Sequence, residues 1–147
     1  MSEQGIPEGF TPLPIGGEFI KTNGPLYLRR EAERVQLGFR VEARHTNPMA
    51  ICHGGMLASF ADMLLPVCIH RHMHDSPKRF LPTISLQLDY MAPAPLGAWV
   101  QGEAQVLRST LTMVFAQGLI TADGKLAVRV SGTFKLGKLL SEMLPKA

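Results

Sequence analysis

Residues 47–62 read NPMAICHGGMLASFAD: an asparagine, then His-Gly-Gly, then an apolar run that ends in a single aspartate. Apolar residues recur from the second glycine onward at a spacing of three and four, the period of an α-helix with one buried face. They are Leu57, Phe60, Ala61, Leu64, Leu65 and Cys68. The pattern predicts a helix from about Gly54 to His72. Pro66 lies inside this helix and should bend it, unless the helix breaks there.

Strand patterns lie on both sides of this helix. Alternating apolar and polar residues predict a half-buried strand from Arg34 and another from Thr83 to Tyr90. Three further strand-like runs cover about 98–108, 111–121 and 125–135, and Asp123-Gly124 between the last two is typical of a tight hairpin. Short connections imply antiparallel neighbours. The predicted fold class is α+β, with an antiparallel sheet wrapped around a long central helix.

The length and composition suit one globular domain. The chain has 147 residues, of which 46% are hydrophobic, enough for a sizeable core. Four prolines and several glycines fall within residues 1–25. We therefore predict an irregular N-terminal arm over residues 1–25 and a single domain over residues 26–147.

Charge and cysteine usage narrow the partners and the location. The net charge is only +3 and the basic residues are scattered, which disfavours nucleic acid or a membrane surface as partner but leaves small anionic ligands open. The first ten residues lack a signal-peptide pattern, and no apolar stretch reaches the roughly 18 residues of a membrane span. Cys52 should lie at the start of the helix and Cys68 well inside it, so no disulfide between them is expected. We expect a soluble, cytoplasmic protein.

The two glycines are candidates for binding an oxygen atom. Gly54 and Gly55 begin a helix, where the first backbone N–H groups have no partner within the helix. Glycine lets a ligand approach the backbone closely, and the helix dipole favours the negative charge that develops on a carbonyl under attack. The alternative is that Gly-Gly only forms a tight turn into the helix.

Asp62 is a candidate nucleophile or general base. A carboxylate in the middle of a helix rich in Leu, Met and Phe is costly unless it is paired or used. It could attack an electrophilic carbonyl carbon or activate a water molecule, or it could simply face solvent beside Ser59.

The spacing between these groups places constraints on any shared site. Gly54 and Asp62 are eight residues apart on one helix, which separates them by about 12 Å of helical rise. One carbonyl cannot reach both. If both act on the same bond, Asp62 must come from a second subunit, and the site lies at a dimer interface.

The residues 47–62, the segment YMAPAPLG and the ending ADGKLAVRVSGTF resemble the hotdog-fold acyl-CoA thioesterases of the phenylacetate-degradation type. The resemblance covers residues 26–135. It implies a dimer whose two sheets join into one, often paired again into a tetramer. It also implies hydrolysis of an acyl-CoA thioester without a metal or another cofactor. The acyl group cannot be read from the pattern.

Three further residues complete the predicted catalytic set. Asn47 could position the carbonyl or the attacking water, or it could only cap its loop. His53 is expected to fix the loop by hydrogen bonds rather than act as a base. The resemblance places Thr83 where related enzymes carry a small hydroxyl residue near the catalytic carboxylate, although an ordinary strand threonine is equally compatible.

The resemblance also implies a path for coenzyme A. It assigns the path of the pantetheine arm and phosphates to Tyr90–Pro95, including Met91 and Pro93, together with the turn that holds Arg108 and Ser109. Related enzymes often have a glycine and a basic residue in this turn, where this chain has Thr110 and Leu111. Arg108 would have to bind the phosphates in place of that missing basic residue. Ala50 replaces a glycine that is usual three residues before His53, and predicts a slightly altered loop.

A metal site is a poorer interpretation of the histidines near the end of the helix. His70, His72, His74 and Asp75 lie close together in sequence. A stable zinc site needs three or four convergent ligands, and histidines at a helix C-terminus also favour the dipole and water. No functional metal is expected.

Two other functions fit the same fold. An enoyl-CoA hydratase or dehydratase would need a histidine soon after Pro48, where Met49 and Ala50 stand instead. A non-catalytic acyl-CoA-binding dimer fits the altered phosphate turn but leaves Asn47, Gly54 and Asp62 without a role.

Overall fold

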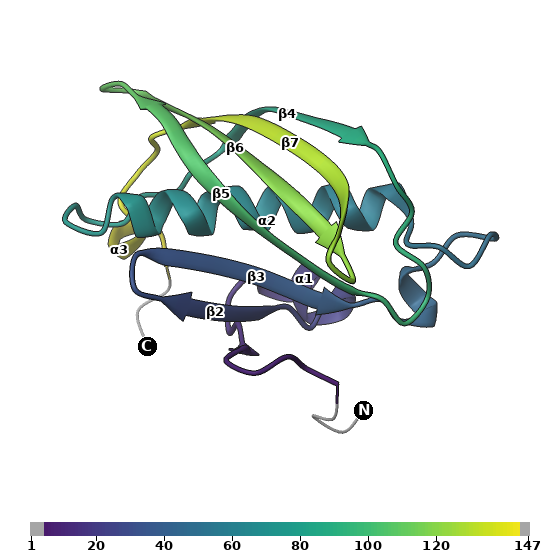
Figure 1. Cartoon of the computed structure of the whole chain (residues 1–147). Helices are drawn as coiled ribbons and strands as arrows, with labels where there is room; N and C mark the ends of the chain where they lie inside the picture. The colour runs from purple at the N-terminus through teal and green to yellow at the C-terminus, as the bar shows by residue number, and fades with distance from the viewer. Residues whose placement is uncertain (1–4, 145–147) are drawn as a thin grey trace.

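The computed structural model describes residues 5–144, which form one curved sheet and three α-helices (Figure 1). In chain order the elements are β1 (Thr11–Pro12), α1 (Gly17–Asn23), β2 (Tyr27–Glu31), β3 (Arg34–Arg40), the 3₁₀ helix η1 (Ala43–His45), α2 (Gly54–His72), β4 (Thr83–Tyr90), β5 (Trp99–Ser109), β6 (Met113–Ala122), β7 (Lys125–Lys135) and α3 (Leu140–Met143). No helix within residues 5–144 is long and apolar enough to cross a membrane.

The sheet has the strand order β1-β2-β3-β5-β6-β7-β4, and every pair of neighbours is antiparallel. Strands β4 to β7 pass along one side of α2, whereas β2 and β3 pass along another, so the sheet curves around the helix (Figure 1). The predicted antiparallel sheet around a long central helix is confirmed. Strand β4 ends the sheet on one side and has no strand partner beyond it within residues 5–144.

The core lies between α2 and the inner face of the sheet. The largest side chains that are fully buried there include Phe39, Phe60 and Phe134. Gly102 and Gly132 lie on the inner face, where an added Cβ would come within 2.7 Å of Leu64 and 2.8 Å of Leu65 respectively. These glycines let the helix and the sheet approach closely.

The regular elements match the sequence prediction closely. Helix α2 runs from Gly54 to His72 as predicted, and Pro66 lies inside it without breaking it. Strand β4 also has its predicted bounds. Asp123 and Gly124 between β6 and β7 both have positive φ, at 48° and 80°, as the predicted hairpin turn requires.

The prediction of an irregular arm over residues 1–25 is wrong for residues 11–12 and 17–23, which form β1 and α1. The part of this arm at residues 1–4 lies outside the described residues. Gly16-Gly17 and Gly24-Pro25 surround α1 and conceal it in the sequence, because both pairs are typical turn signals. Burial of Ile20 in the core compensates for the weak local preference. Strand β2 and helix α3 were also not predicted, since short elements have little periodicity.

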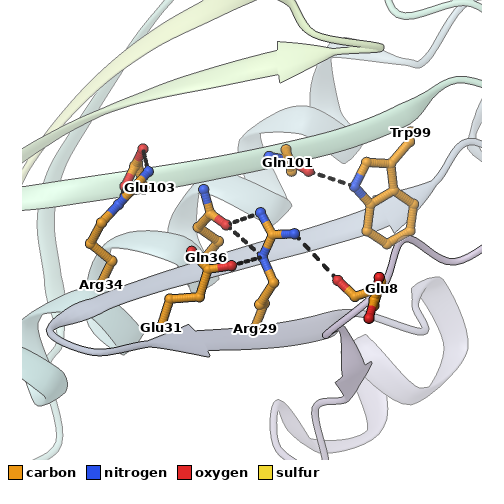
Figure 2. Close-up of polar contacts among 8 residues, drawn as sticks. All are labelled: Glu8, Arg29, Glu31, Arg34, Gln36, Trp99, Gln101 and Glu103. Atoms are coloured by element: carbon orange, nitrogen blue, oxygen red, sulfur yellow. Dashed lines mark hydrogen bonds and ion pairs between the residues drawn. The ribbon is translucent and has the colours of Figure 1, made fainter.

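The arm covers part of the outer face of the sheet (Figure 2). Trp99 lies over Gly38, and the ring of Phe10 packs edge-on against it at 5.1 Å. Arg29 donates hydrogen bonds to the side chain of Gln36 and to the backbone carbonyl of Glu8. Gln36 is one of the polar residues in the alternating pattern of this strand, yet only 8% of its surface is exposed, because Arg29 binds its side chain.

We expect Gly38→Ala to lower the free energy of unfolding by about 1–3 kcal/mol, because the new Cβ would lie 2.3 Å from the Trp99 ring. Urea denaturation followed by circular dichroism measures this loss. In a Trp99→Leu background the same substitution should cost much less, since the clash is gone. An equal loss in both backgrounds would show that the ring does not limit the space at Gly38.

Candidate active site

The loop before α2 is held by Asn47. Its Oδ1 atom accepts hydrogen bonds from the backbone N–H groups of Met49 and Ile51, at 2.9 and 3.4 Å. Ala50, in the same loop, has a φ of +58°, a left-handed conformation that glycine adopts most readily. The alanine therefore keeps the backbone conformation that the usual glycine would favour. Asn47 caps this loop through its oxygen, which leaves its side-chain N–H₂ group for another role.

His53 caps the N-terminus of α2. Its Nδ1 atom accepts a hydrogen bond from the Gly55 N–H at 2.8 Å, and its own backbone N–H donates to the His45 carbonyl. The Gly55 N–H is thus already engaged within the chain. No acceptor is found for the Gly54 N–H among residues 5–144. Gly54 therefore presents the open donor at this end of the helix.

Tyr90, at the end of β4, contacts the same end of α2. Its hydroxyl donates a 2.7 Å hydrogen bond to the Gly54 carbonyl, and its ring lies 3.4 Å from where a Gly54 Cβ would be. Burial, and then the nearby Cys52, raise the pKa of Tyr90, so the phenol keeps its proton at neutral pH. The side chain is still 54% exposed, which leaves part of the ring available to a ligand.

Asp62 and Thr83 meet two turns further along α2. The Thr83 hydroxyl donates a 2.6 Å hydrogen bond to Asp62 Oδ1, and both residues are exposed. This bond orients one carboxylate oxygen and leaves the other accessible. Strand β4 therefore contacts the catalytic candidates at both of its ends, through Thr83 at Asp62 and through Tyr90 at Gly54.

The remaining candidates fall into two groups. Met91 and Pro93 are exposed and follow Tyr90 directly, near the N-terminus of α2. Arg108 and Ser109 lie at the other end of the sheet, level with Thr83. Ser109 pairs with Val114, Val114 pairs with Phe134 in β7, and Phe134 pairs with Thr83. Within one chain, the structure thus separates the Tyr90 group from the Arg108 group.

His45 contributes to this region but was not singled out from the sequence. Its ring is buried, donates from Nε2 to the Asn23 carbonyl at 2.6 Å, and packs edge-on against Phe39. The Nδ1 atom accepts from the Glu42 N–H. An isolated histidine between charged and polar neighbours carries no periodic signal, so its burial became visible only in the structure.

The histidines near the end of α2 bind backbone atoms and a neighbouring carboxylate. His70 Nε2 lies 2.9 Å from the Arg79 carbonyl, and His74 Nε2 lies 3.1 Å from Asp75. Within residues 5–144 no group of three or more His, Cys, Asp or Glu side chains is arranged to hold a metal ion.

Neither cysteine is suited to act as a nucleophile. Both are free and buried, and burial raises the pKa of Cys52 to about 12 and that of Cys68 to about 11. The reactive form of cysteine is the thiolate, which is scarce at neutral pH for such values. The accessible carboxylate of Asp62 is the better candidate in this region.

Sequence comparison relates the chain to thioester-cleaving proteins. The family model described as the thioesterase superfamily matches residues 49–128. A Pseudomonas aeruginosa protein with a provisional esterase name is 29% identical over 132 residues, which are 89% of this chain and 97% of that protein. Human acyl-coenzyme A thioesterase 13 is 30% identical over 100 residues, which are 67% of this chain and 69% of that protein.

Solved structures share the fold. The zebra fish thioesterase superfamily member 2 superposes with a TM-score of 0.70 at 27% identity, covering 83% of this chain and 87% of the other. A mutant of the phenylacetic acid degradation protein PaaI from Thermus thermophilus gives a TM-score of 0.68 at 22% identity, covering 80% and 96%. The predicted hotdog fold is confirmed, and solved structures with this fold include a protein of the predicted phenylacetate-degradation type.

We expect Cys52 and Cys68 to resist thiol reagents in the folded protein. At pH 8, pKa values of about 12 and 11 leave roughly 1 in 10,000 and 1 in 1,000 of these groups as thiolate. Titration with a chromogenic disulfide should detect almost no fast-reacting thiol in buffer and two per chain in urea. Rapid reaction of either thiol in buffer would contradict its burial.

Proposed function

The chain belongs to the thioesterase superfamily and is a thioester hydrolase, and we propose that its substrates are acyl-CoA thioesters, cleaved to a free acid and coenzyme A. The observation that carries the proposal is that one helix presents both an open backbone donor, at Gly54, and an oriented, accessible carboxylate, at Asp62. The relationship to acyl-coenzyme A thioesterase 13 supports the choice of acyl-CoA.

Gly54 would polarise the thioester carbonyl. Its N–H group lies at the positive end of the dipole of a 19-residue helix, and it needs no rearrangement to donate a hydrogen bond to the developing oxyanion. The Gly55 N–H donates to His53 Nδ1 and the Tyr90 hydroxyl donates to the Gly54 carbonyl, and these two bonds hold the backbone around Gly54 in place. Gly55 supports the same turn, although its own N–H is engaged with His53.

Asp62 would drive the attack on the carbonyl carbon, either directly or by removing a proton from water. Thr83 holds the carboxylate through its hydroxyl, and such a charge-assisted bond fixes the direction of the free oxygen. The Asn47 amide N–H₂ group would hold the attacking water or the carbonyl, while its oxygen maintains the loop.

Two copies of the chain would form each site. Gly54 and Asp62 lie about 12 Å apart along one helix, so Asp62 must come from a second copy whose helix runs beside the first. Gly55 and Asp62 are exposed on the face of α2 that the sheet does not cover. Strand β4 offers eight residues of unpaired edge, with Ile84 about half exposed, and such an edge favours pairing with another strand.

The same arrangement would bring the two coenzyme A segments together. Tyr90, Met91 and Pro93 lie near Gly54, whereas Arg108 and Ser109 lie at the end of the sheet that holds Thr83 and Asp62. When Gly54 of one copy faces Asp62 of the other, the two groups come to flank one substrate. Pairing of dimers into a tetramer and a cytoplasmic location complete the proposal, since two free cysteines suit a reducing compartment.

Asp62→Asn should lower kcat by at least about 1,000-fold, because the amide can neither accept a proton nor attack the thioester. Release of free thiol from a panel of aromatic and aliphatic acyl-CoAs measures this loss and identifies the preferred acyl group. Wild type and variant must be confirmed as the same oligomer. Equal turnover would remove Asp62 from the mechanism, and absent turnover in wild type would favour a non-catalytic acyl-CoA binder.

Gly54→Pro should lower kcat by about 100- to 1,000-fold, the effect of losing one oxyanion donor, with little change in stability. Proline is well tolerated at the first position of a helix, and the extended backbone of His53, with ψ of 137°, is compatible with a following proline. Gly54→Ala, which keeps the N–H, is the matched control and should retain far more activity.

Mixing the two inactive variants tests whether the site is shared. A heterodimer of the Gly54→Pro and Asp62→Asn chains contains one site with both native groups only if they come from different copies. Coexpression with two affinity tags would isolate this heterodimer, which should recover about half of the wild-type activity if the sites act independently. An inactive heterodimer would place both groups in one chain's site.

A further inference from the structure

A cavity of about 330 Å³ lies between α1 and the first two turns of α2. Its lining includes Phe19 from α1, Arg44 from η1, and His53, Gly55, Met56 and Ser59 around the start of α2. Two of these lining residues, His53 and Gly55, are the sequence neighbours of the proposed oxyanion donor Gly54. No part of the substrate has yet been assigned to this cavity.

The wall that α1 forms is firmly attached. The carbonyls of Thr22 and Gly24 accept hydrogen bonds from Arg44, and the Asn23 carbonyl accepts from His45. The His45 carbonyl in turn accepts from the His53 N–H. A continuous chain of hydrogen bonds therefore holds α1 in a fixed position relative to the N-terminus of α2.

Phe19 gives this wall an apolar surface. It is 59% exposed, whereas the next residue, Ile20, is buried in the core and anchors the helix. Met56 lines the opposite side of the cavity from α2. An exposed aromatic side chain that lines a hollow next to a catalytic helix is typical of a surface that a ligand covers.

The charge in the cavity suits an uncharged group better than a phosphate. Arg44 is the arginine in the lining, and its guanidinium already binds the Glu42 carboxylate and the carbonyls of Thr22 and Gly24. Little positive charge is left for a coenzyme A phosphate, which would also need several donors.

The position of the cavity relative to Gly54 indicates which part of the substrate enters it. Tyr90 lies against Gly54 on one side, and the segment after it is one of the two assigned to coenzyme A. The cavity adjoins Gly55 and His53, and Ser59 one turn further on. The carbonyl carbon of a thioester carries two substituents, the sulfur and the acyl chain, and these point in different directions. If the sulfur lies on the Tyr90 side of Gly54, the acyl chain lies on the Phe19 side.

We propose that this cavity binds the acyl group of the thioester and that Phe19 limits the length of that group. This inference rests on the proposed function, because it uses the carbonyl position at Gly54. The volume is near the lower end of the range for ligand pockets, which is about 300–1,000 Å³. The substrate class is therefore a short or single-ring acyl group, and truncation of Phe19 should admit longer chains.

The first test uses S-(2-oxoalkyl)-CoA thioethers with butyl, octyl or dodecyl chains, which keep a carbonyl for the Gly54 N–H but have no thioester bond to hydrolyse. Calorimetry gives Kd for the butyl, octyl and dodecyl thioethers with wild type, Phe19→Ala and Lys21→Ala. Lys21 is the matched control because it is exposed on α1 but does not line this cavity. We expect Phe19→Ala to shift the ratio of dodecyl to butyl affinity at least about tenfold toward dodecyl, and Lys21→Ala to leave it unchanged. An unchanged ratio in Phe19→Ala, or an equal loss for all lengths, would overturn the proposal.

A second measurement detects occupancy of the cavity directly. Cys52 and Cys68 are buried, so Phe19→Cys introduces the accessible thiol of the described chain. Saturating butyl thioether should slow its alkylation by iodoacetamide at least about fivefold relative to Lys21→Cys. If wild type hydrolyses acyl-CoA but the thiol of Phe19→Cys is not protected, the cavity assignment alone is overturned. Protection without hydrolysis would overturn the proposed activity alone, and absence of both would overturn both.

Discussion

The packing of Leu64 and Leu65 of α2 against Gly102 and Gly132 sets the distance between the helix and the sheet. With no side chains at those two points, the inner face of the sheet can close over a helix of 19 residues. One face of α2 is then buried completely, and the other remains uncovered. The exposure of Asp62 follows from this division of the helix into two faces.

The uncovered face gives one chain two incomplete parts of a site. The N-terminus supplies an open N–H at Gly54, and the middle of the helix supplies the carboxylate of Asp62. A rigid helix cannot bring these groups together, so the proposed chemistry depends on a second copy. Strand β4 contacts both parts through Tyr90 and Thr83, and within residues 5–144 it also forms one edge of the sheet. The site geometry and the proposed assembly are therefore linked through one strand.

The N-terminal segment completes the surroundings of the helix. Phe10 packs against Trp99 on the outer face of the sheet, and α1 lines a cavity beside the start of α2. His45 connects α1 to this start through buried hydrogen bonds. A segment rich in glycine and proline thus forms one wall of the cavity that we assign to the acyl group.

The sequence by itself determined the bounds of α2 and β4, the hairpin at Asp123-Gly124, and the presence of Gly54 and Asp62 on one helix. Periodicity, turn chemistry and helical rise predict these features because all three are local properties. Only the tertiary structure decided that the Gly55 N–H is engaged by His53 while that of Gly54 stays open, and that the Thr83 hydroxyl binds Asp62. It also decided that residues 17–23 form a helix over a cavity. These features depend on contacts between segments far apart in the chain, and burial of Ile20 and His45 outweighs what their neighbours in sequence indicate.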